Sequence, residues 1–280
     1  MIIAQLRMSV GFFFTLMLLG CSQINDQPAN EPLSDAQRIH PESWPSQAPP
    51  LERDPAMEAA IADLLSRMTL EEKVGQVMQA DIADVTPEEV REYNLGSVLN
   101  GGNSAPGGDN RAAPDQWLAL ADEFWDASTD TSDGGVGIPT IWGTDAMHGH
   151  SNVLGATLFP HNIGLGMVND PDMMYDIGRI TALEMRSTGL DWTFAPTVAV
   201  VRDDRWGRTY ESFSEDPKIV AAYAPRIVEG LQGILGTDEF LDADHTIATA
   251  KHYVGDGGTI DGIDQGNNVS SEHDLRNLHA

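Results

Sequence analysis

Cysteine and basic residues are scarce in this sequence. Its 280 residues include one cysteine, Cys21, so an internal disulfide cannot form and metal sites built on cysteine pairs are excluded. Lysine and arginine number 16 against 43 aspartates and glutamates, which gives a net charge of −27 at pH 7. Such a surface repels phosphate groups, which argues against a nucleic-acid partner. We interpret the acidic surplus as an adaptation for solubility rather than as a patch for a cationic partner.

The apolar run at the N-terminus is too short for a membrane span. Arg7 precedes the run Met8–Leu19, whereas a membrane-spanning helix needs about 20 apolar residues. A positive residue followed by a short apolar run is typical of a secretory signal peptide, here predicted over residues 1–20.

A lipid attachment site is predicted at the end of this signal. Leu18–Cys21 (LLGC) resembles a bacterial lipobox, in which the cysteine is acylated and becomes the first residue of the mature protein. The alternative is an ordinary secretory signal with a chance cysteine. The residue after Cys21 is Ser22 and not an aspartate, a pattern that resembles lipoproteins sorted to the outer membrane rather than those retained in the inner membrane. We therefore expect export across the inner membrane to the periplasm, with anchoring to the outer membrane through lipid alone.

Residues 21–55 are predicted to form a tether and residues 56–280 a folded domain. Seven prolines fall between Pro28 and Pro55, among mostly polar residues. This composition keeps a chain extended and semi-rigid. Such a tether would hold the domain away from the lipid surface.

Helix start signals recur along the domain. Thr69–Glu72 fits a capping box. In Asp170-Pro171 and Asp216-Pro217, a capping residue precedes proline, which is favoured at the first helical position. Helices are therefore predicted over residues 61–68, from 69 through 78, from 86, and over 114–127, 170–186 and 216–235, with a last one opening at 271.

Short apolar segments alternate with these helices. Strands are predicted at residues 95–99, 138–142, within 190–201, and at 246–254. Strand, polar loop and helix in alternation indicate a parallel sheet, and no GxGxxG fingerprint or phosphate loop follows any strand. Four such units are half of the eight that a (β/α)8 barrel needs over about 250 residues. The expected fold class is α/β, a partial (β/α)8 TIM-like barrel comprising about its first half.

Ionisable side chains follow the predicted strands, where β/α barrels carry their chemistry. Asp145 follows the second strand, Arg208 the third, and Lys251 and His252 end the fourth. A carboxylate that accepts two hydrogen bonds suits vicinal sugar hydroxyls, although a helix cap or a surface aspartate fits Asp145 equally well. Lys251 and His252 point to opposite faces of an ideal strand, so both reach one pocket only if the strand ends there.

Other polar and aromatic residues near these positions have two interpretations. His148, His150 and His161 suggest a metal site, but their spacing is loose, and we expect them to hold loops by hydrogen bonds. Trp206 suits a sugar-stacking platform as well as loop packing. The segment Arg202–Arg208 alternates in charge, so at least one of its arginines is expected in an internal ion pair.

Several strings of the domain resemble glycoside hydrolase family 3, in that family's order. They are Gly137–His150 (GIPTIWGTDAMHGH), Gly155–Asn162, Phe194–Pro196, Arg202–Ser212 (RDDRWGRTYES) and Ala250–Thr259 (AKHYVGDGGT). The resemblance runs from about residue 57 to the end of the chain. It implies a (β/α)8 barrel followed by an α/β sandwich domain. It also implies cleavage of β-linked sugars from non-reducing ends with retention of configuration.

The resemblance assigns substrate-binding residues. Asp145 matches the aspartate that holds sugar hydroxyls at the terminal subsite. Arg208, Lys251 and His252 match the arginine, lysine and histidine around that sugar. The implied partner is a β-linked oligosaccharide or glucoside, and no cofactor or metal is implied.

Two departures from the family pattern bear on the substrate. The N-acetylglucosaminidase branch carries a loop histidine after the Lys-His pair, used as acid/base, whereas Gly255–Gly258 (GDGG) stands here. This favours a glucoside over an N-acetylglucosaminide. In plant-like glucan-active members an acidic residue often stands shortly after the Asp-Gly-Ile stretch; here Gln265 follows Asp264, and the linkage stays open.

The catalytic carboxyl groups are expected outside this chain. A retaining glycosidase needs two carboxyl groups about 5 to 5.5 Å apart. By the resemblance, the nucleophile is an aspartate of a later strand and the acid/base a glutamate of the second domain, and neither segment occurs before Ala280. The chain is thus expected to be a truncated β-glucosidase or exo-β-glucanase without turnover of its own. The alternative is a lipoprotein that binds a sugar without cleaving it.

Overall fold

The computed structural model describes residues 38–101 and 104–280. The chain divides into two units, residues 1–47 and 48–280. The described part of the first unit contains one 3₁₀ turn, Pro41–Ser43. The predicted signal peptide, Cys21 and the start of the predicted tether lie outside the described residues. Within those residues, no helix has the length and apolar character that crossing a membrane requires.

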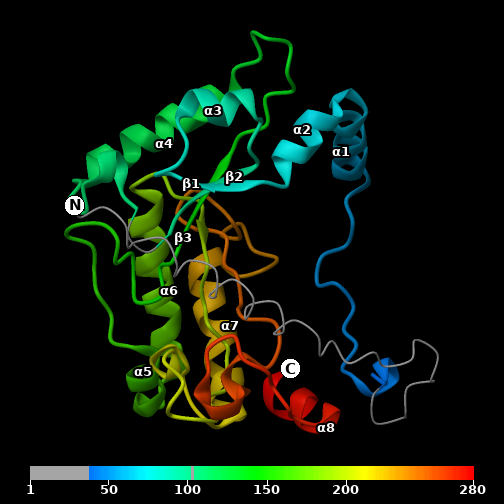
Figure 1. The fold of residues 1–280 in the computed structure, drawn as a ribbon, viewed down its shortest axis with the longest axis vertical. Helices are drawn as coiled ribbons and strands as arrows, with labels where there is room; N and C mark the ends of the chain where they lie inside the picture. The colour runs from blue at the N-terminus through cyan, green and yellow to red at the C-terminus, as the bar shows by residue number, and fades with distance from the viewer. Residues whose placement is uncertain (1–37, 102–103) are drawn as a thin grey trace, which may run out of the picture. The chain divides into compact units, whose positions relative to one another are not determined.

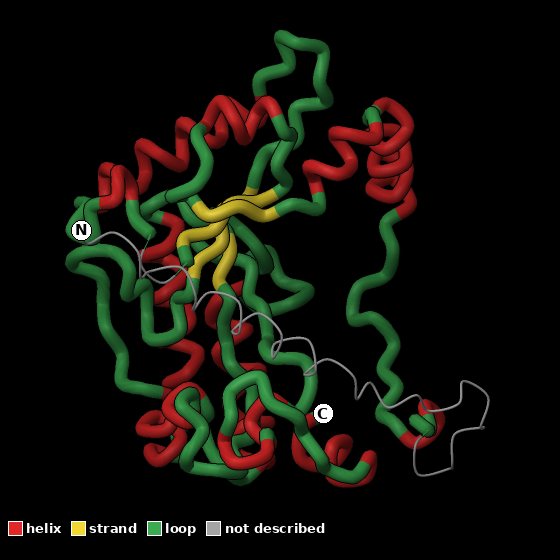
Figure 2. Tube along the Cα trace, in the orientation of Figure 1, coloured by secondary structure: helices red, strands yellow, loops and turns green. Residues whose placement is uncertain are grey.

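A parallel sheet of four short strands organises the second unit (Figure 1). Its order is β1-β2-β3-β4, and each neighbouring pair is parallel. Figure 2 shows the strands together in yellow, with red helices above and below them in that view. The strands are β1 (Gln79–Asp81), β2 (Ser97–Asn100), β3 (Ile141–Thr144) and β4 (Trp192–Thr193). The predicted α/β class with a parallel sheet is confirmed.

The α-helices are α1 (Pro55–Arg67), α2 (Leu70–Gln76), α3 (Pro87–Glu92), α4 (Pro114–Thr129), α5 (Asn162–Val168), α6 (Pro171–Arg186), α7 (Pro217–Gln232) and α8 (Glu272–Asp274). Helices α6 and α7 start where their capping residues predict, whereas α1 begins at Pro55, before the predicted residues 61–68. The Asp170 carboxylate accepts a hydrogen bond from Met173 N, and the Asp216 carboxylate accepts one from Lys218 N. These caps satisfy backbone N–H groups that lack partners in the first turn.

The third predicted strand is short in the structure, and the fourth does not form. Of residues 190–201, only the two residues of β4 form a strand. The prediction of a strand over residues 246–254 is wrong: this segment lies parallel to β4 and the residues after it through two isolated bridges, one of them at Lys251. Lys251 N donates to Pro196 O, but Pro196 has no N–H of its own, so a continuous ladder cannot form there.

Strand β1 was not predicted from the sequence. The sequence predicts a helix from residue 69 through 78, but α2 ends at Gln76, and the side chains of Val77 and Met78 are exposed. The chain then turns directly into β1, whose sequence Gln-Ala-Asp contains no β-branched or aromatic residue. Its strand conformation comes from pairing with β2 rather than from local preference.

Two hydrophobic clusters hold the helices in place around the sheet. The first joins α3, α4, β2 and β3 and includes Val90, Val98, Trp117, Phe124 and Trp142. The second joins α5, α6 and α7 and includes Leu165, Met174, Ile177, Tyr223, Ile227 and Leu231. Helices α6 and α7 lie side by side (Figure 1). Glycines allow their close approach, because a Cβ on Gly230 would collide with the carbonyl oxygen of Tyr175.

Candidate substrate-binding site

A cleft at the carboxyl end of the sheet brings the four predicted site residues together. Asp145 directly follows β3, Arg208 lies in the loop between β4 and α7, and Lys251 with His252 ends the segment beside β4. Ligands of open β/α sheets bind outside the carboxyl ends of the strands. The cleft has a volume of about 360 Å³ and is lined by Asp145, Met147, Arg208, Tyr210, Glu211, Lys251 and His252.

An ion pair between Lys251 and Asp145 forms one side of the cleft. Lys251 Nζ donates to Asp145 Oδ1 over 2.7 Å. The lysine side chain is 13% exposed and the aspartate side chain 43% exposed. Among the residues that the structure describes, no donor reaches the second oxygen, Asp145 Oδ2. The pair therefore presents a carboxylate oxygen and ammonium hydrogens to a ligand at the same point.

A second ion pair joins Arg208 to the buried Glu211. Arg208 Nε donates to Glu211 Oε1 and Arg208 Nη2 to Glu211 Oε2, each over 2.8 Å. Thr197 Oγ1 also donates to Oε2, over 3.0 Å. Burial would raise the pKa of Glu211, but the hydrogen bonds and the charge of Arg208 outweigh burial and hold the pKa below its ordinary value. Glu211 is thus ionised near neutral pH.

Lys251 and His252 both face the cleft because the bridged segment ends between them. The bridge to Thr197 occurs at Lys251, and the peptide bond that follows is cis. His252 Nδ1 lies 2.6 Å from Asp256 Oδ2. The aspartate side chain is 13% exposed and the histidine side chain 34% exposed. Asp256 therefore lies directly beside the Nδ1 edge of the His252 ring.

The cleft also contains residues to which the sequence predictions gave no role. Glu211 lies within the family-like segment Arg202–Ser212, but its role depends on Arg208 three residues earlier. The spacing Arg-x-x-Glu was the available signal, because residues three apart can pair across one helical turn. Here a 3₁₀ turn, Thr209–Glu211, brings the two side chains together. No comparable sequence pattern predicts that Met147 and Tyr210 line the cleft.

The histidines near the cleft are structural. His150 is fully buried, and its Nε2 lies 2.9 Å from Thr188 Oγ1, as expected for a loop-holding hydrogen bond. His148 and His161 differ from that expectation, because their rings lie tilted against the ring of Tyr210, at centroid distances of 5.7 and 4.7 Å. Across residues 38–101 and 104–280, histidine, cysteine, aspartate and glutamate side chains form no group of three that could hold a metal ion.

Trp206 and Arg205 have packing roles. Trp206 is 2% exposed and its indole N–H donates to Asp264 Oδ1 over 2.9 Å, so the loop-packing interpretation holds and the sugar-stacking one is wrong. Arg205 pairs with Asp203 over 2.6 Å and with Asp261 over 3.2 Å. The internal ion pair predicted for this segment is therefore present.

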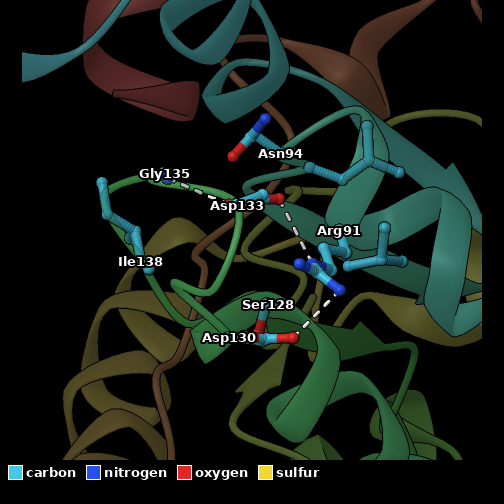
Figure 3. A pocket seen from close by; sticks show the side chains of 10 residues that line it. Arg91, Asn94, Ser128, Asp130, Asp133, Gly135 and Ile138 are labelled. Atoms are coloured by element: carbon cyan, nitrogen blue, oxygen red, sulfur yellow. Dashed lines mark hydrogen bonds and ion pairs between the residues drawn. The ribbon is translucent and has the colours of Figure 1, made fainter.

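A smaller cavity lies at the opposite, amino end of the strands (Figure 3). Its volume of about 10 Å³ is close to the minimum that one water molecule needs. Arg91 Nη1 lies 2.9 Å from Asp130 Oδ2, and Arg91 Nε lies 3.3 Å from Asp133 Oδ2. These pairs fix the loop between α4 and β3 to α3. The cavity is too small for a sugar, so we assign a stabilising role in the fold to the ion pairs that line it.

Three comparisons relate the chain to known proteins. Residues 69–280 match the model of the glycosyl hydrolase family 3 N-terminal domain. The crystal structure of an exo-1,3/1,4-β-glucanase from a Pseudoalteromonas species is similar, with a TM-score of 0.81 and 57% identity, over 84% of this chain and 29% of that chain. A lysosomal β-glucosidase of Dictyostelium discoideum is 31% identical, over 71% of this chain and 26% of its own length. A periplasmic β-glucosidase of Salmonella typhimurium is 29% identical, over 71% of this chain and 23% of its own length.

The chain spans about a quarter of the length of these curated relatives. The matched region includes the whole cleft described above.

Proposed function

The chain belongs to glycoside hydrolase family 3, and we propose that it supplies the wall of the active site that holds the terminal β-D-glucosyl residue of a β-glucoside or β-glucan. The whole protein then acts as an exo-acting β-glucosidase or exo-β-glucanase. The names of the relatives support this substrate class, because two of these proteins are named as β-glucosidases and one as an exo-β-glucanase.

The observation that carries the proposal is that one exposed carboxylate, Asp145, lines the same cleft as two cations, Lys251 and Arg208. A sugar presents adjacent hydroxyls, each of which can donate and accept a hydrogen bond. Asp145 accepts from two such hydroxyls, while Lys251 and Arg208 donate to their oxygens. Charge-assisted hydrogen bonds of this kind are about twice as strong as neutral ones. The side chains of Asp145, Glu211, Lys251 and Arg208 together carry no net charge, which suits a neutral sugar.

Hydrolysis with retention requires a nucleophile and an acid/base about 5 to 5.5 Å apart. The two carboxylates that line the cleft, Asp145 and Glu211, each form an ion pair with a cation. The lowered pKa of Glu211 makes it unsuitable as a proton donor. We therefore propose that both catalytic carboxyl groups lie outside residues 1–280, and that this chain alone binds the glucosyl unit without turnover.

Titration of the chain with laminaribiose, a β-linked glucose disaccharide, tests the proposal. We expect saturable binding by calorimetry and no release of glucose. Asp145→Asn should weaken binding by about 10- to 100-fold, because it removes a charged acceptor from the sugar hydroxyls. Asp176→Asn, a change on α6 away from the residues that line the cleft, is the matched control and should bind as the wild type does.

Other outcomes would separate the remaining alternatives. Preference for N-acetylglucosamine over glucose would place the protein in the N-acetylglucosaminidase branch. Specific glucose release by the chain would overturn the assignment of the catalytic carboxyl groups. Sugar binding in a protein whose gene ends at codon 280 would leave a non-catalytic binding lipoprotein.

We also propose that the protein is exported to the periplasm and anchored to the outer membrane through an acylated Cys21. The periplasmic location in the name of the Salmonella typhimurium relative supports export. Labelling with radioactive palmitate in a Gram-negative host tests the anchor. We expect a labelled membrane fraction, with loss of label and release of the protein in Cys21→Ser. Release of an unlabelled wild-type protein would contradict it.

A further inference from the structure

Glu211 is the most buried charged side chain of the cleft. The residue is 5% exposed, and both of its carboxylate oxygens accept hydrogen bonds from within the protein. Two parallel N–H···O bonds fix the plane of the Arg208 guanidinium as well as its position. The third bond, from Thr197 Oγ1, ties the carboxylate to the segment that follows β4. These three bonds use most of the about four acceptor positions of the carboxylate, and its burial leaves little of it for a sugar to reach.

Asp145 has the opposite environment in the same cleft. Its side chain is 43% exposed and is paired through one oxygen, with Lys251. If Glu211 did not hold Arg208, the guanidinium could pair with the exposed carboxylate of Asp145, which lines the same cleft. That pairing would remove the acceptor that the sugar hydroxyls need. The two carboxylates therefore have different roles, because one meets the ligand and the other holds a cation in place.

We propose that Glu211 is a positioning residue, which holds the guanidinium of Arg208 so that its other N–H groups face the sugar and Asp145 stays available. This inference rests on the proposed function of the cleft. Glu211 does not contact the ligand, so its effect on binding passes through Arg208.

A double-mutant cycle on the 280-residue chain tests this, with laminaribiose as the probe. Glu211→Gln should weaken binding by about 10- to 100-fold, because a neutral amide cannot make the bidentate charged pair. Arg208→Gln should weaken binding by a similar or larger factor. If Glu211 acts through Arg208, the double variant binds no more weakly than Arg208→Gln alone. Losses that multiply in the double variant would overturn the proposal.

Matched variants separate positioning from a general effect on folding. Glu229→Gln removes the carboxylate of another arginine pair with the same three-residue spacing, on α7 and outside the cleft, and should leave binding unchanged. Glu211→Asp keeps the charge and should bind more tightly than Glu211→Gln. The melting temperature of each variant is measured together with its affinity. If Glu211 had a purely structural role, Glu211→Gln would lower the melting temperature but leave the affinity of the folded protein unchanged.

The outcomes distinguish this inference from the function on which it rests. If the wild type does not bind laminaribiose, or if Asp145→Asn binds as well as the wild type, the proposed function fails and this inference fails with it. If binding depends on Asp145 but Glu211→Gln binds as the wild type does, the function stands and the positioning role is refuted.

Discussion

The buried imidazole of His150 should make the stability of the fold depend on pH. The side chain is 0% exposed, and its Nε2 contacts Thr188 Oγ1. Among the described residues no partner reaches Nδ1. Because burial disfavours the charged ring, it lowers the pKa of His150 from 6.5 to about 4.

The sign and size of the effect follow from this lowered pKa. The unfolded chain takes up the proton at His150 more readily than the folded chain, so acid favours unfolding. The stability that the neutral ring preserves is fully present above about pH 6.5 and is lost as the pH falls toward 4. Between about pH 7.5 and about pH 5, this one group should remove about 2 kcal/mol from the free energy of unfolding.

Urea unfolding at these two pH values, followed by circular dichroism, measures the effect. Both values stay above the sequence pI of about 4.3, where solubility would fail. His150→Leu should show a loss on acidification that is smaller than the wild-type loss by about 2 kcal/mol. His273→Leu, at an exposed histidine, should keep the wild-type loss. Equal losses in the wild type and His150→Leu would refute the reasoning.

Two further predictions concern the packing around the sheet. Gly230→Ala should lower the free energy of unfolding by about 1 to 3 kcal/mol, because its Cβ would collide with Tyr175 O; Gly164→Ala, where a Cβ meets open space on α5, should be neutral or stabilising in the same urea titration. Arg91→Ala should cost about 1 kcal/mol or less, because its ion pairs are partly exposed. It should raise hydrogen exchange in residues 130–137 and leave laminaribiose binding unchanged; weakened binding would contradict the structural role of that cavity.

The parts of the fold that could be predicted from sequence are those with local causes. Asp170 and Asp216 cap α6 and α7 because each side chain bonds a backbone N–H two or three residues ahead. The sequence contains everything that such a cap requires. Strand β1 has no local cause, since its three residues pair with β2 across a helix and two loops. The strand predicted over residues 246–254 was wrong for a similar reason, because the interruption comes from Pro196 on the neighbouring segment.

The site divides in the same way. Asp145, Arg208, Lys251 and His252 follow predicted strands, the resemblance to the family assigns them to the sugar, and the structure places all four in one cleft. Glu211 was missed because its role exists only once a 3₁₀ turn folds it against Arg208. The role of Trp206 could not be predicted, because its solvent exposure decides between loop packing and sugar stacking. That exposure is set only when the loop folds.

The most direct test of the central claim is a map of the backbone amide resonances that shift when glucose is added to the ¹⁵N-labelled chain. The account predicts saturable shifts at Asp145, Arg208, Lys251 and His252, with none at Arg91 or Asp133 at the other end of the sheet. Saturable shifts confined to other regions, or no shifts at these four residues in the folded chain, would contradict it.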